Sequence, residues 1–420
     1  MITPALFLVF LLSAVPIAFV LALTAVAYIF ESGNSVLLDS FAQQLFSGVE
    51  NYGLLAIPLF MLTGELMNDG GMTRRLIAAA RVFVGGFRGG LAYINLVANM
   101  FMAAIIGSAA SQIAVMSRAM VPAMEKEGYD KGFAAATTAA GGLLAPVIPP
   151  SMLFVIYGVL AQLPIGDMFL AGILPGLMLA AAFALVIAVI GVVQGFPKGE
   201  WMSARDAAGA LLACLPAALI PTAIIGGILL GVATPTESAA VASLIAFLVG
   251  WLGYRELAPA RLFAIFKRTA ITSAMVIFMI AAANVFGWVV IYEALPQKLA
   301  LLVTLVTEDP FLFLLIVNCG LLLVGMLIDG IAAIILVTPI LLPIATGTYD
   351  IDPFHLGVVM SLNLVLGLLT PPVGVGLYLA SAMSGASTGA ILKALWPFLL
   401  AVTLILGVLS YFPVLTTALL

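Results

Sequence analysis

Charged residues are scarce in this chain: only 8% of its 420 residues are Asp, Glu, Lys or Arg, whereas 64% are hydrophobic. A water-soluble domain carries roughly 25% charged residues, so this chain lacks the polar surface of a soluble enzyme or of a disordered protein. A formal net charge of −4 also argues against a nucleic-acid-binding protein. With a mean hydropathy of +1.27, the sequence predicts an all-α polytopic membrane protein.

Cysteine and histidine are almost absent. Cys214 and Cys319 lie in apolar runs and offer neither a disulfide framework nor a thiolate metal site. His355 is the only histidine, and without clustered partners it does not indicate a proton relay or a metal site. The chain also lacks a Gly-x-Ser-x-Gly elbow, a Walker loop, a His-Glu-x-x-His motif and a dinucleotide fingerprint. ATP therefore does not drive this chain directly, and we expect an ion gradient to do so.

Long apolar runs dominate the sequence, and about 20 apolar residues suffice to cross a bilayer core of ~30 Å. Nine runs meet this requirement, at 3–30, 52–69, 131–160, 169–194, 207–231, 236–253, 269–293, 355–380 and 391–412. Two more stretches, 91–124 and 311–344, are interrupted in their middles by residues 107–111 and 329–330. Each is too short for two ordinary spans and too long for one, which predicts a re-entrant helical hairpin in each.

Basic residues predict the orientation. If the two hairpins enter from opposite sides, thirteen of the fifteen Lys and Arg residues fall on one side. Only Lys298 falls on the opposite side, and Arg118 lies within the first hairpin. Because basic residues in short loops mark the cytoplasmic face, we expect a cytoplasmic N-terminus and a periplasmic C-terminus. The first hairpin then opens to the cytoplasm and the second to the outside.

The two halves of the sequence resemble each other at an offset of 222 residues, which aligns 145–151 with 367–373 and 107–108 with 329–330. We therefore expect two inverted repeats, each with scaffold helices, an arm helix, a re-entrant hairpin and a Pro-broken transmembrane helix. The expected domains are 1–194 (hairpin 91–124, broken helix 131–160), a linking loop and helix at 195–231, and 232–420 (hairpin 311–344, broken helix 355–380). Such paired broken helices indicate a secondary transporter with a site near the middle of the membrane.

Two amphipathic stretches, 72–85 and 295–307, precede the two hairpins. They are interpreted either as plain interfacial helices or as arms that link a fixed scaffold to a moving core.

Proline pairs interrupt both predicted broken helices, at 149–150 and at 371–372. Proline lacks a backbone donor and frees a carbonyl one turn earlier, and in lipid such groups must face a cavity, a partner or an ion. One pair alone would favour a simple kink, but two pairs beside matched hairpins favour ion sites whose oxygen ligands suit a small alkali cation. The first predicted ligand set is Ser108, Ser111, Ala145, Ile148 and Pro150. The second is Gly330 or Gly325, with Gly367, Thr370 and Val373.

Four ionisable residues lie within or beside the spans. Because ionisable residues are costly in a membrane, each is either functional or structural. Asp329 either meets a cation or caps the hairpin loop. Glu65 lies near the cytoplasmic end of its span, which favours a scaffold or snorkelling role. Glu237 follows Pro235 at a helix start, which favours helix capping. Arg118 either attracts an anionic substrate or forms an ion pair between hairpin and scaffold.

Several of these stretches together are typical of one family: 57–67, 107–111, 148–151, 231–242 and the run from 352–357 through Asn363 to 370–374. On these residues the chain resembles the large permease subunit (DctM-like) of TRAP transporters, the tripartite ATP-independent periplasmic transporters. The resemblance implies a sodium-coupled importer of small organic acids, such as a C4-dicarboxylate or a sialic acid, that works by an elevator mechanism. It implies a bacterial or archaeal cytoplasmic (inner) membrane and no enzymatic activity.

The resemblance also implies partners and site residues. A small four-helix membrane subunit (DctQ-like), as a separate polypeptide, and a periplasmic substrate-binding protein (DctP-like) would complete the transporter. The family's two sodium sites fall on the two oxygen sets named above, with Na⁺ as the coupling ion and no other cofactor. The substrate would lie between the hairpin tips, with Gly107, Asp329, Asn363 and Arg118 as candidates for its region.

Three alternatives stay open on the residues alone. The first is a stand-alone ion-coupled carboxylate transporter of related architecture that needs no binding protein. The second is an intramembrane enzyme, although such enzymes usually expose clustered acidic or His/Ser groups that this sequence lacks. The third is a gated channel, which saturable stoichiometric coupling to sodium would exclude.

Overall fold

The structure is a computed structural model that describes residues 2–13, 15–34 and 36–420, and this part of the chain is all-helical apart from loops and one isolated β-bridge between Arg88 and Lys198. The helices of the first half are α1 Ile2–Leu12, α2 Ile17–Ser32, α3 Val36–Ser47, η1 Tyr52–Leu55, α4 Ala56–Asp69, α5 Met72–Val84, α6 Gly90–Ile106, α7 Ala109–Lys126, α8 Lys131–Gly142, α9 Met152–Leu160 and α10 Ile165–Val193. One long helix, α11 Ala204–Leu229, follows. The helices of the second half are α12 Pro235–Leu248, η2 Val249–Gly253, α13 Pro259–Tyr292, α14 Leu295–Thr304, α15 Pro310–Leu327, α16 Gly330–Tyr349, α17 Pro353–Leu368, α18 Val375–Ser384, α19 Thr388–Tyr411 and α20 Val414–Thr417. The prediction of an all-α chain is confirmed.

Five consecutive helices recur in the same order in the two halves. The helices α6 to α10 begin at residues 90, 109, 131, 152 and 165, and α15 to α19 begin at 310, 330, 353, 375 and 388. The paired starts therefore differ by 220 to 223 residues. The inversion of the second copy relative to the membrane stays a prediction.

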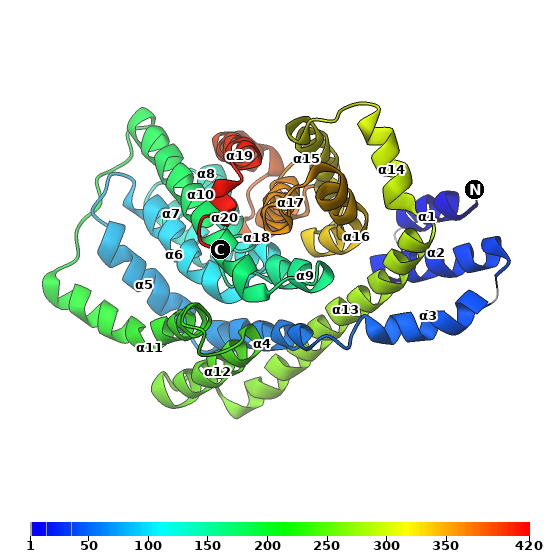
Figure 1. Cartoon of the computed structure of the whole chain (residues 1–420). Helices are drawn as coiled ribbons and strands as arrows, with labels where there is room; N and C mark the ends of the chain where they lie inside the picture. The colour runs from blue at the N-terminus through cyan, green and yellow to red at the C-terminus, as the bar shows by residue number, and fades with distance from the viewer. Residues whose placement is uncertain (1, 14, 35) are drawn as a thin grey trace.

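The helices form two groups, which we call the core and the scaffold. The core consists of the hairpins and broken helices, α6–α10 and α15–α19, in which α15 packs against α17, α7 against α8 and α18, and α16 against α9 and α17. The scaffold consists of α2–α4 and α11–α13, in which α13 packs against α2, α3 and α4, and α12 packs against α4 and α11. In Figure 1, α4 and α13 run below the hairpins and broken helices.

Composition explains why α8 and α17 lie at the centre of the core. A helix that is apolar on all sides has no face suited to water and is buried. Every residue of α17 from His355 to Leu368 is buried, and so is every residue of α8 from Gly132 to Gly142. The second stretch consists mostly of Ala, Gly and Thr, small residues that let neighbouring helices approach closely.

The predicted spans are largely found, with differences that follow from the helix breaks. Seven helices of the described residues are long and apolar enough to cross a membrane, and an eighth span arises if the bent α3–α4 pair counts as one. Five of the seven lie at predicted spans, and the other two, α15 and α16, are the arms of the second hairpin. The broken helices α8–α9 and α17–α18 are not counted, because each of their pieces is too short.

The prediction of one span at 3–30 is wrong. The chain turns back near Pro16, so that α1 and α2 form an antiparallel pair. The backbone N–H of Thr3 donates to the Glu31 carboxylate at 2.7 Å, which places the beginning of α1 beside the end of α2. The cytoplasmic orientation of the N-terminus depended on a single crossing here and stays a prediction without that support.

The prediction that residues 311–344 are too short for two ordinary spans is also wrong. Its arms, α15 and α16, have 18 and 20 residues, and each is long and apolar enough to cross a membrane by itself. The hairpin at 311–344 is therefore not too short for two spans. That it is re-entrant stays a prediction, which depends on the position of its tip described below.

The two amphipathic stretches are helices that touch both groups. Helix α5 packs against α6 of the core and α11 of the scaffold, and α14 packs against α13 and α16. This arrangement favours the interpretation of both helices as arms over that of plain interfacial helices.

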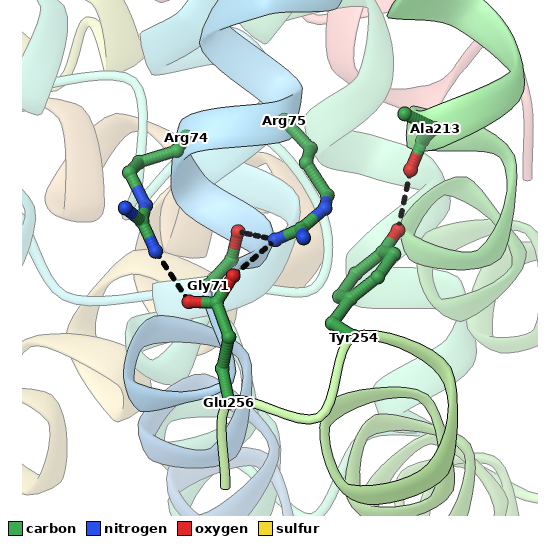
Figure 2. Close-up of polar contacts among 6 residues, drawn as sticks. All are labelled: Gly71, Arg74, Arg75, Ala213, Tyr254 and Glu256. Carbon is green, nitrogen blue, oxygen red and sulfur yellow. Dashed lines mark hydrogen bonds and ion pairs between the residues drawn. The ribbon is translucent and has the colours of Figure 1, made fainter.

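The first arm is fastened to the scaffold by an ion cluster at its beginning (Figure 2). Arg74 and Arg75 of α5 both bond to the carboxylate of Glu256, which lies between η2 and α13. The Arg75 guanidinium also donates to the Gly71 carbonyl at 2.8 Å and lies 3.7 Å from the centre of the Tyr254 ring. The Tyr254 hydroxyl donates to the Ala213 carbonyl of α11 at 2.7 Å. The start of α5 is thus tied to two scaffold elements.

Acidification is expected to weaken this cluster. Hydrogen bonds from Arg75 and Arg74 lower the pKa of Glu256 below its usual range. A lowered pKa in the folded state contributes stability above the unfolded carboxyl pKa of about 4.3, and that stability is lost as the pH falls through the folded value. We expect Glu256→Gln to lower the free energy of unfolding by about 0.5 to 1 kcal/mol at pH 7, since exposed ion pairs contribute little more.

Thermal unfolding at pH 7 and pH 4 measures this effect. The difference between wild type and Glu256→Gln should be present at pH 7 and shrink at pH 4. The matched control is Glu50→Gln, an exposed carboxylate that belongs to none of the ion pairs found among the described residues. An equal effect of both substitutions at both pH values would refute the assignment.

Candidate functional site

Two helix breaks lie at the centre of the core. Helix α8 ends at Gly142 and α9 begins at Met152, whereas α17 ends at Leu368 and α18 begins at Val375. Each gap contains one proline pair, and both Pro–Pro peptide bonds are cis. The helices therefore stop for several residues at both places, which is more than the simple kink that one proline pair would suggest.

Each break is hydrogen-bonded to its own hairpin in an equivalent way. The backbone N–H of Met152 donates to the Gly107 carbonyl at 3.3 Å. In the second half, the N–H of Gly374 donates to the Met326 carbonyl at 3.2 Å. Met152 and Gly374 are separated by the sequence offset of 222. In both halves, the residue that follows the proline pair by two positions is thus tied to the end of the first hairpin arm.

Both hairpin tips and the first break surround one small cavity of about 20 Å³. Its walls include Gly107 and Ser108 of the first tip, Asp329 and Gly330 of the second tip, and Pro146 of the first break. A cavity of ~10–15 Å³ holds about one water molecule, so this space suits an ion or a water molecule and not an organic acid. Because the two tips meet here, in the interior of the core, the geometry favours re-entrance of both hairpins.

Of the first predicted ligand set, Ser108 lines this cavity, and the Pro150 carbonyl lies beside Gly107 of the same tip. Ser108 is half-buried at the first tip, and Ser111 is exposed one turn later in α7. The carbonyl oxygens of Ala145, Ile148 and Pro150 lie in the break, and within the described chain no N–H or O–H group donates to them. Main-chain oxygens without donors and serine hydroxyls are suitable ligands for a small cation, and their convergence on one ion stays a prediction.

In the second predicted ligand set, the structure favours Gly325 over Gly330 as the residue that supplies a carbonyl. A Cβ atom on Gly367 would lie 2.5 Å from the main-chain carbon of Gly325, so these two backbones touch. Gly330 instead faces the side chains of Leu153 and Leu364. The Thr370 hydroxyl donates to the Leu366 carbonyl at 2.7 Å, and Val373 lies exposed in the second break. That the carbonyls of Gly325, Gly367, Thr370 and Val373 form a second ion site stays a prediction, and the Gly367 oxygen already accepts from the Thr370 N–H at 2.9 Å.

A larger cavity of about 180 Å³ lies between the first hairpin and the scaffold. The hairpin contributes Ser108, Ser111 and Val115 to its wall. The scaffold contributes Glu65 and Asn68 from α4 and Thr269 and Thr272 from α13. Ser108 lines both cavities, so the small and the large space adjoin at the first hairpin tip.

Glu65, on the wall of the larger cavity, belongs to an ion cluster within the scaffold. Arg268 of α13 donates to Glu65 at 2.8 Å and to Asp69 at 2.7 Å. This cluster joins α4 to α13, so the scaffold interpretation of Glu65 agrees with the structure.

The other ionisable candidates have mainly structural surroundings. Asp329 accepts from the Ile331 N–H at 3.0 Å and caps α16, although it also lines the small cavity. Glu237 completes a capping box with Thr234 at the start of α12, as expected. The His355 ring nitrogen Nδ1 lies 2.9 Å from the Thr416 hydroxyl at the end of the chain.

Two substrate-region candidates do not lie at either cavity. Asn363 is fully buried between α17 and α15, where its side chain donates to the Asn318 carbonyl at 2.9 Å. Arg118 is exposed on α7, and its Nε atom lies 3.4 Å from the sulfur of Met383. It forms no ion pair among the described residues, so the expected pair with the scaffold is not found. Gly107 and Asp329, in contrast, do line the small cavity.

Sequence reasoning missed a buried chain of amides in the first half. Gln112, Asn99, Asn95 and Thr138 are all fully buried and hydrogen-bonded to one another across α7, α6 and α8. The spacing of Asn95 and Asn99, one helical turn apart in an apolar run, was the available signal. No group of three or more His, Cys, Asp and Glu residues suited to a metal occurs in the described residues.

Comparison with known proteins gives a consistent result. The family described as the DctM component of the tripartite ATP-independent periplasmic transporter matches residues 5–415. The sialic acid TRAP transporter large permease protein SiaM of Vibrio cholerae is 36% identical over 403 residues, covering 96% of this chain and 94% of the relative. The C4-dicarboxylate TRAP transporter large permease protein DctM of Pseudomonas aeruginosa is 37% identical over 380 residues, covering 90% and 89%.

A solved structure supports the fold. The crystal structure of the YdaH transporter of Alcanivorax borkumensis, described as having an unusual topology, matches with a TM-score of 0.66 at 13% identity, covering 91% of this chain and 89% of that one. At this identity the likeness concerns the fold alone. On the family match and the relatives, the chain is a multi-pass membrane permease rather than an enzyme, and it belongs to the DctM family, the large component of TRAP transporters.

Proposed function

We propose that this chain imports a small organic acid, driven by sodium, as the large membrane subunit of a TRAP transporter in a bacterial inner membrane. The named relatives transport sialic acid, C4-dicarboxylates and 2,3-diketo-L-gulonate, all of which are organic acids. One observation carries the proposal: both hairpin tips and the first helix break meet at an ion-sized cavity, and that break contains carbonyl oxygens that accept no hydrogen bond from the described chain.

Sodium binding is assigned to the two oxygen clusters. Ser108, Ser111 and the carbonyls of Ala145, Ile148 and Pro150 would hold the first ion. The carbonyls of Gly325, Gly367 and Val373 with Thr370 would hold the second. The aligned peptide dipoles of broken helices supply partial charges that help to bind ions at such places. The 20 Å³ cavity is too small for the acid, so the substrate is assigned to the adjoining 180 Å³ cavity.

An elevator movement is the proposed mechanism. The core carries both oxygen clusters, whereas the wall of the larger cavity is shared between core and scaffold. The arms α5 and α14 contact both groups, and the cluster at Glu256 would keep the beginning of α5 with the scaffold while the core slides. The ion cluster of Arg268 with Glu65 and Asp69 would hold α4 to α13 during this movement.

The proposed partners are a small membrane subunit and a periplasmic substrate-binding protein. A relative from Oleidesulfovibrio alaskensis is named an isethionate TRAP transporter permease protein DctMQ. It is 37% identical over 409 residues, and the match covers 64% of that relative's length. The remainder of that relative has room for a small subunit in the same polypeptide, so we propose a corresponding subunit here.

Uptake into proteoliposomes tests the proposal. The chain is reconstituted with its small subunit, and the binding protein is added outside with radiolabelled sialic acid, a C4-dicarboxylate or 2,3-diketo-L-gulonate. We expect uptake of one acid that needs the binding protein and an inward sodium gradient. Equal uptake with potassium or choline in place of sodium would refute sodium coupling. Full uptake by the chain alone would favour a stand-alone transporter instead.

A further inference from the structure

A chain of buried side-chain amides crosses the first hairpin. The side-chain nitrogen of Gln112 in α7 donates to the carbonyl and to the side-chain oxygen of Asn99 in α6, at 2.9 and 2.8 Å. Asn99 donates to the side-chain oxygen of Asn95 at 2.8 Å, and Asn95 donates to the Thr138 hydroxyl of α8 at 2.7 Å. All four side chains are fully buried. The network thus connects both arms of the hairpin to the helix that is broken at Pro149-Pro150.

The equivalent four positions of the second half are occupied by apolar residues. At the offset of 222 residues, Asn95, Asn99, Gln112 and Thr138 correspond to Val317, Leu321, Ile334 and Met360. These four apolar residues are buried as well, with at most 7% exposed. The second half has an amide pair elsewhere, Asn318 with Asn363, but that pair joins α15 to α17 and leaves α16 out. Packing of this fold therefore does not require the amides, and apolar replacements of a buried polar pair are often neutral for stability.

The position of Gln112 relates the network to the first oxygen cluster. Gln112 directly follows Ser111 in α7, and its side-chain nitrogen also lies 3.3 Å from the Gly141 carbonyl. Gly141 is in the last turn of α8, four residues before Ala145. The Gly141 carbonyl also accepts from the Leu144 N–H at 3.1 Å, in the turn that follows α8, so Gln112 binds the chain where the break begins. One amide thus fixes the rotation of α7, which begins after Ser108 and contains Ser111, against the segment that carries the carbonyl ligands.

We infer that Gln112, supported by Asn99 and Asn95, is a positioning residue that sets the sodium affinity of the first site. This inference rests on the proposed function. The second site is tied to its first hairpin arm α15 by Asn318 and Asn363, but no side-chain amide found among the described residues ties its second arm α16 to α17, so the two sites differ in how firmly the second arm is held. A preformed set of ligands loses less conformational entropy when the ion binds, and the affinity of the first site should depend on the amide network.

Sodium alone is the probe for this inference, because no substrate is needed to observe it. The full chain with its small subunit is placed in nanodiscs, and its thermal unfolding midpoint is measured against sodium chloride, with choline chloride keeping the ionic strength constant. A ligand that binds only the folded state raises this midpoint. For Gln112→Met, which keeps the volume and removes the donors, we expect the sodium concentration for half-maximal stabilisation to rise about tenfold. In choline alone, its midpoint should stay within a few degrees of wild type.

The matched control is Asn284→Leu in the scaffold. The Asn284 amide donates to the Gln44 carbonyl at 2.7 Å, a bond of the same type between α13 and α3, and Asn284 lines neither of the two cavities. This variant should lower the midpoint in choline and leave the sodium dependence unchanged. Because Gln112→Met by itself can fail to fold, a second variant copies the apolar set of the second half: Asn95→Val, Asn99→Leu, Gln112→Ile and Thr138→Met together. It should fold and show the same weakened sodium response.

The outcomes separate this inference from the proposed function. A wild-type midpoint that does not respond to sodium would refute sodium binding itself. A wild-type response that is unchanged in a folded Gln112→Met or fourfold variant would overturn only the role of the network. An equal shift of the sodium curve in Asn284→Leu would also overturn it, since general destabilisation would then explain the effect.

Discussion

Replacing Ser108 and Ser111 together by alanine is expected to abolish sodium-dependent uptake at physiological sodium concentrations. These hydroxyls are the only side-chain oxygens in the first cluster, and the other three proposed ligands are main-chain carbonyls. A contact to a charged group contributes about 1.5 to 3 kcal/mol, so losing two of five ligands costs at least about 3 kcal/mol. With about 1.4 kcal/mol for each factor of ten, the sodium concentration for half-maximal uptake should rise by more than about 100-fold.

Uptake into proteoliposomes as a function of external sodium measures this change. Ser117→Ala is the matched control, because Ser117 is buried in the same helix α7 but lines neither of the two cavities. This control should keep the wild-type sodium dependence. An unaltered sodium response of the double variant would show that the first oxygen cluster is assigned wrongly.

Gly367→Ala is expected to abolish uptake by forcing the second hairpin away from the broken helix α17–α18. A Cβ atom at residue 367 would lie 2.5 Å from the main-chain carbon and 2.7 Å from the Cα of Gly325. The atoms in the way belong to the backbone, so no side-chain rotation relieves the overlap. Inserting an extra methyl group into a packed core costs about 1 to 3 kcal/mol, and here it also moves Gly325 and Gly367, two of the proposed ligands.

Helix α15 itself supplies the control for this substitution. Gly320 lies five residues before Gly325 and has open space where a Cβ would be. Gly320→Ala should therefore stabilise the chain by roughly 0.4 to 1 kcal/mol and keep uptake. Thermal unfolding and uptake are measured for both variants. Wild-type uptake by Gly367→Ala would mean that the contact between the two glycines is not needed for transport.

The internal repeat is the reason why much of the core was predictable. A single proline pair is compatible with a kink, but the second pair at the offset of 222, next to a second hairpin, made helix breaks at both places the better interpretation. Helices α8 and α17 end as expected, and Ser108 and Ser111 line the cavities at the first hairpin tip. Local patterns sufficed here because proline acts on its own backbone within one turn.

Other features depended on contacts that are distant in sequence. Hydropathy joined α1 and α2 into one span, because an apolar run does not reveal that Thr3 returns to Glu31. Likewise, Gly325 and Gly330 are equally plausible as ligands until the backbone of Gly367 is seen to touch Gly325. Asn363 lies in a motif of the family, but its side chain donates a hydrogen bond to the side chain of Asn318 inside the core.

The sequence by itself determined that the chain is an all-α membrane protein with two proline-broken helices, two hairpins and no enzymatic motif. Composition, helix-breaking residues and a long repeat are properties of the chain that hold in any arrangement of the helices. Only the tertiary structure decided that the two hairpin tips meet at an ion-sized cavity, that the larger cavity lies against the scaffold, and that Gln112 is bonded across three helices. These facts arise from contacts between residues far apart in the chain, and such contacts leave no local pattern in the sequence.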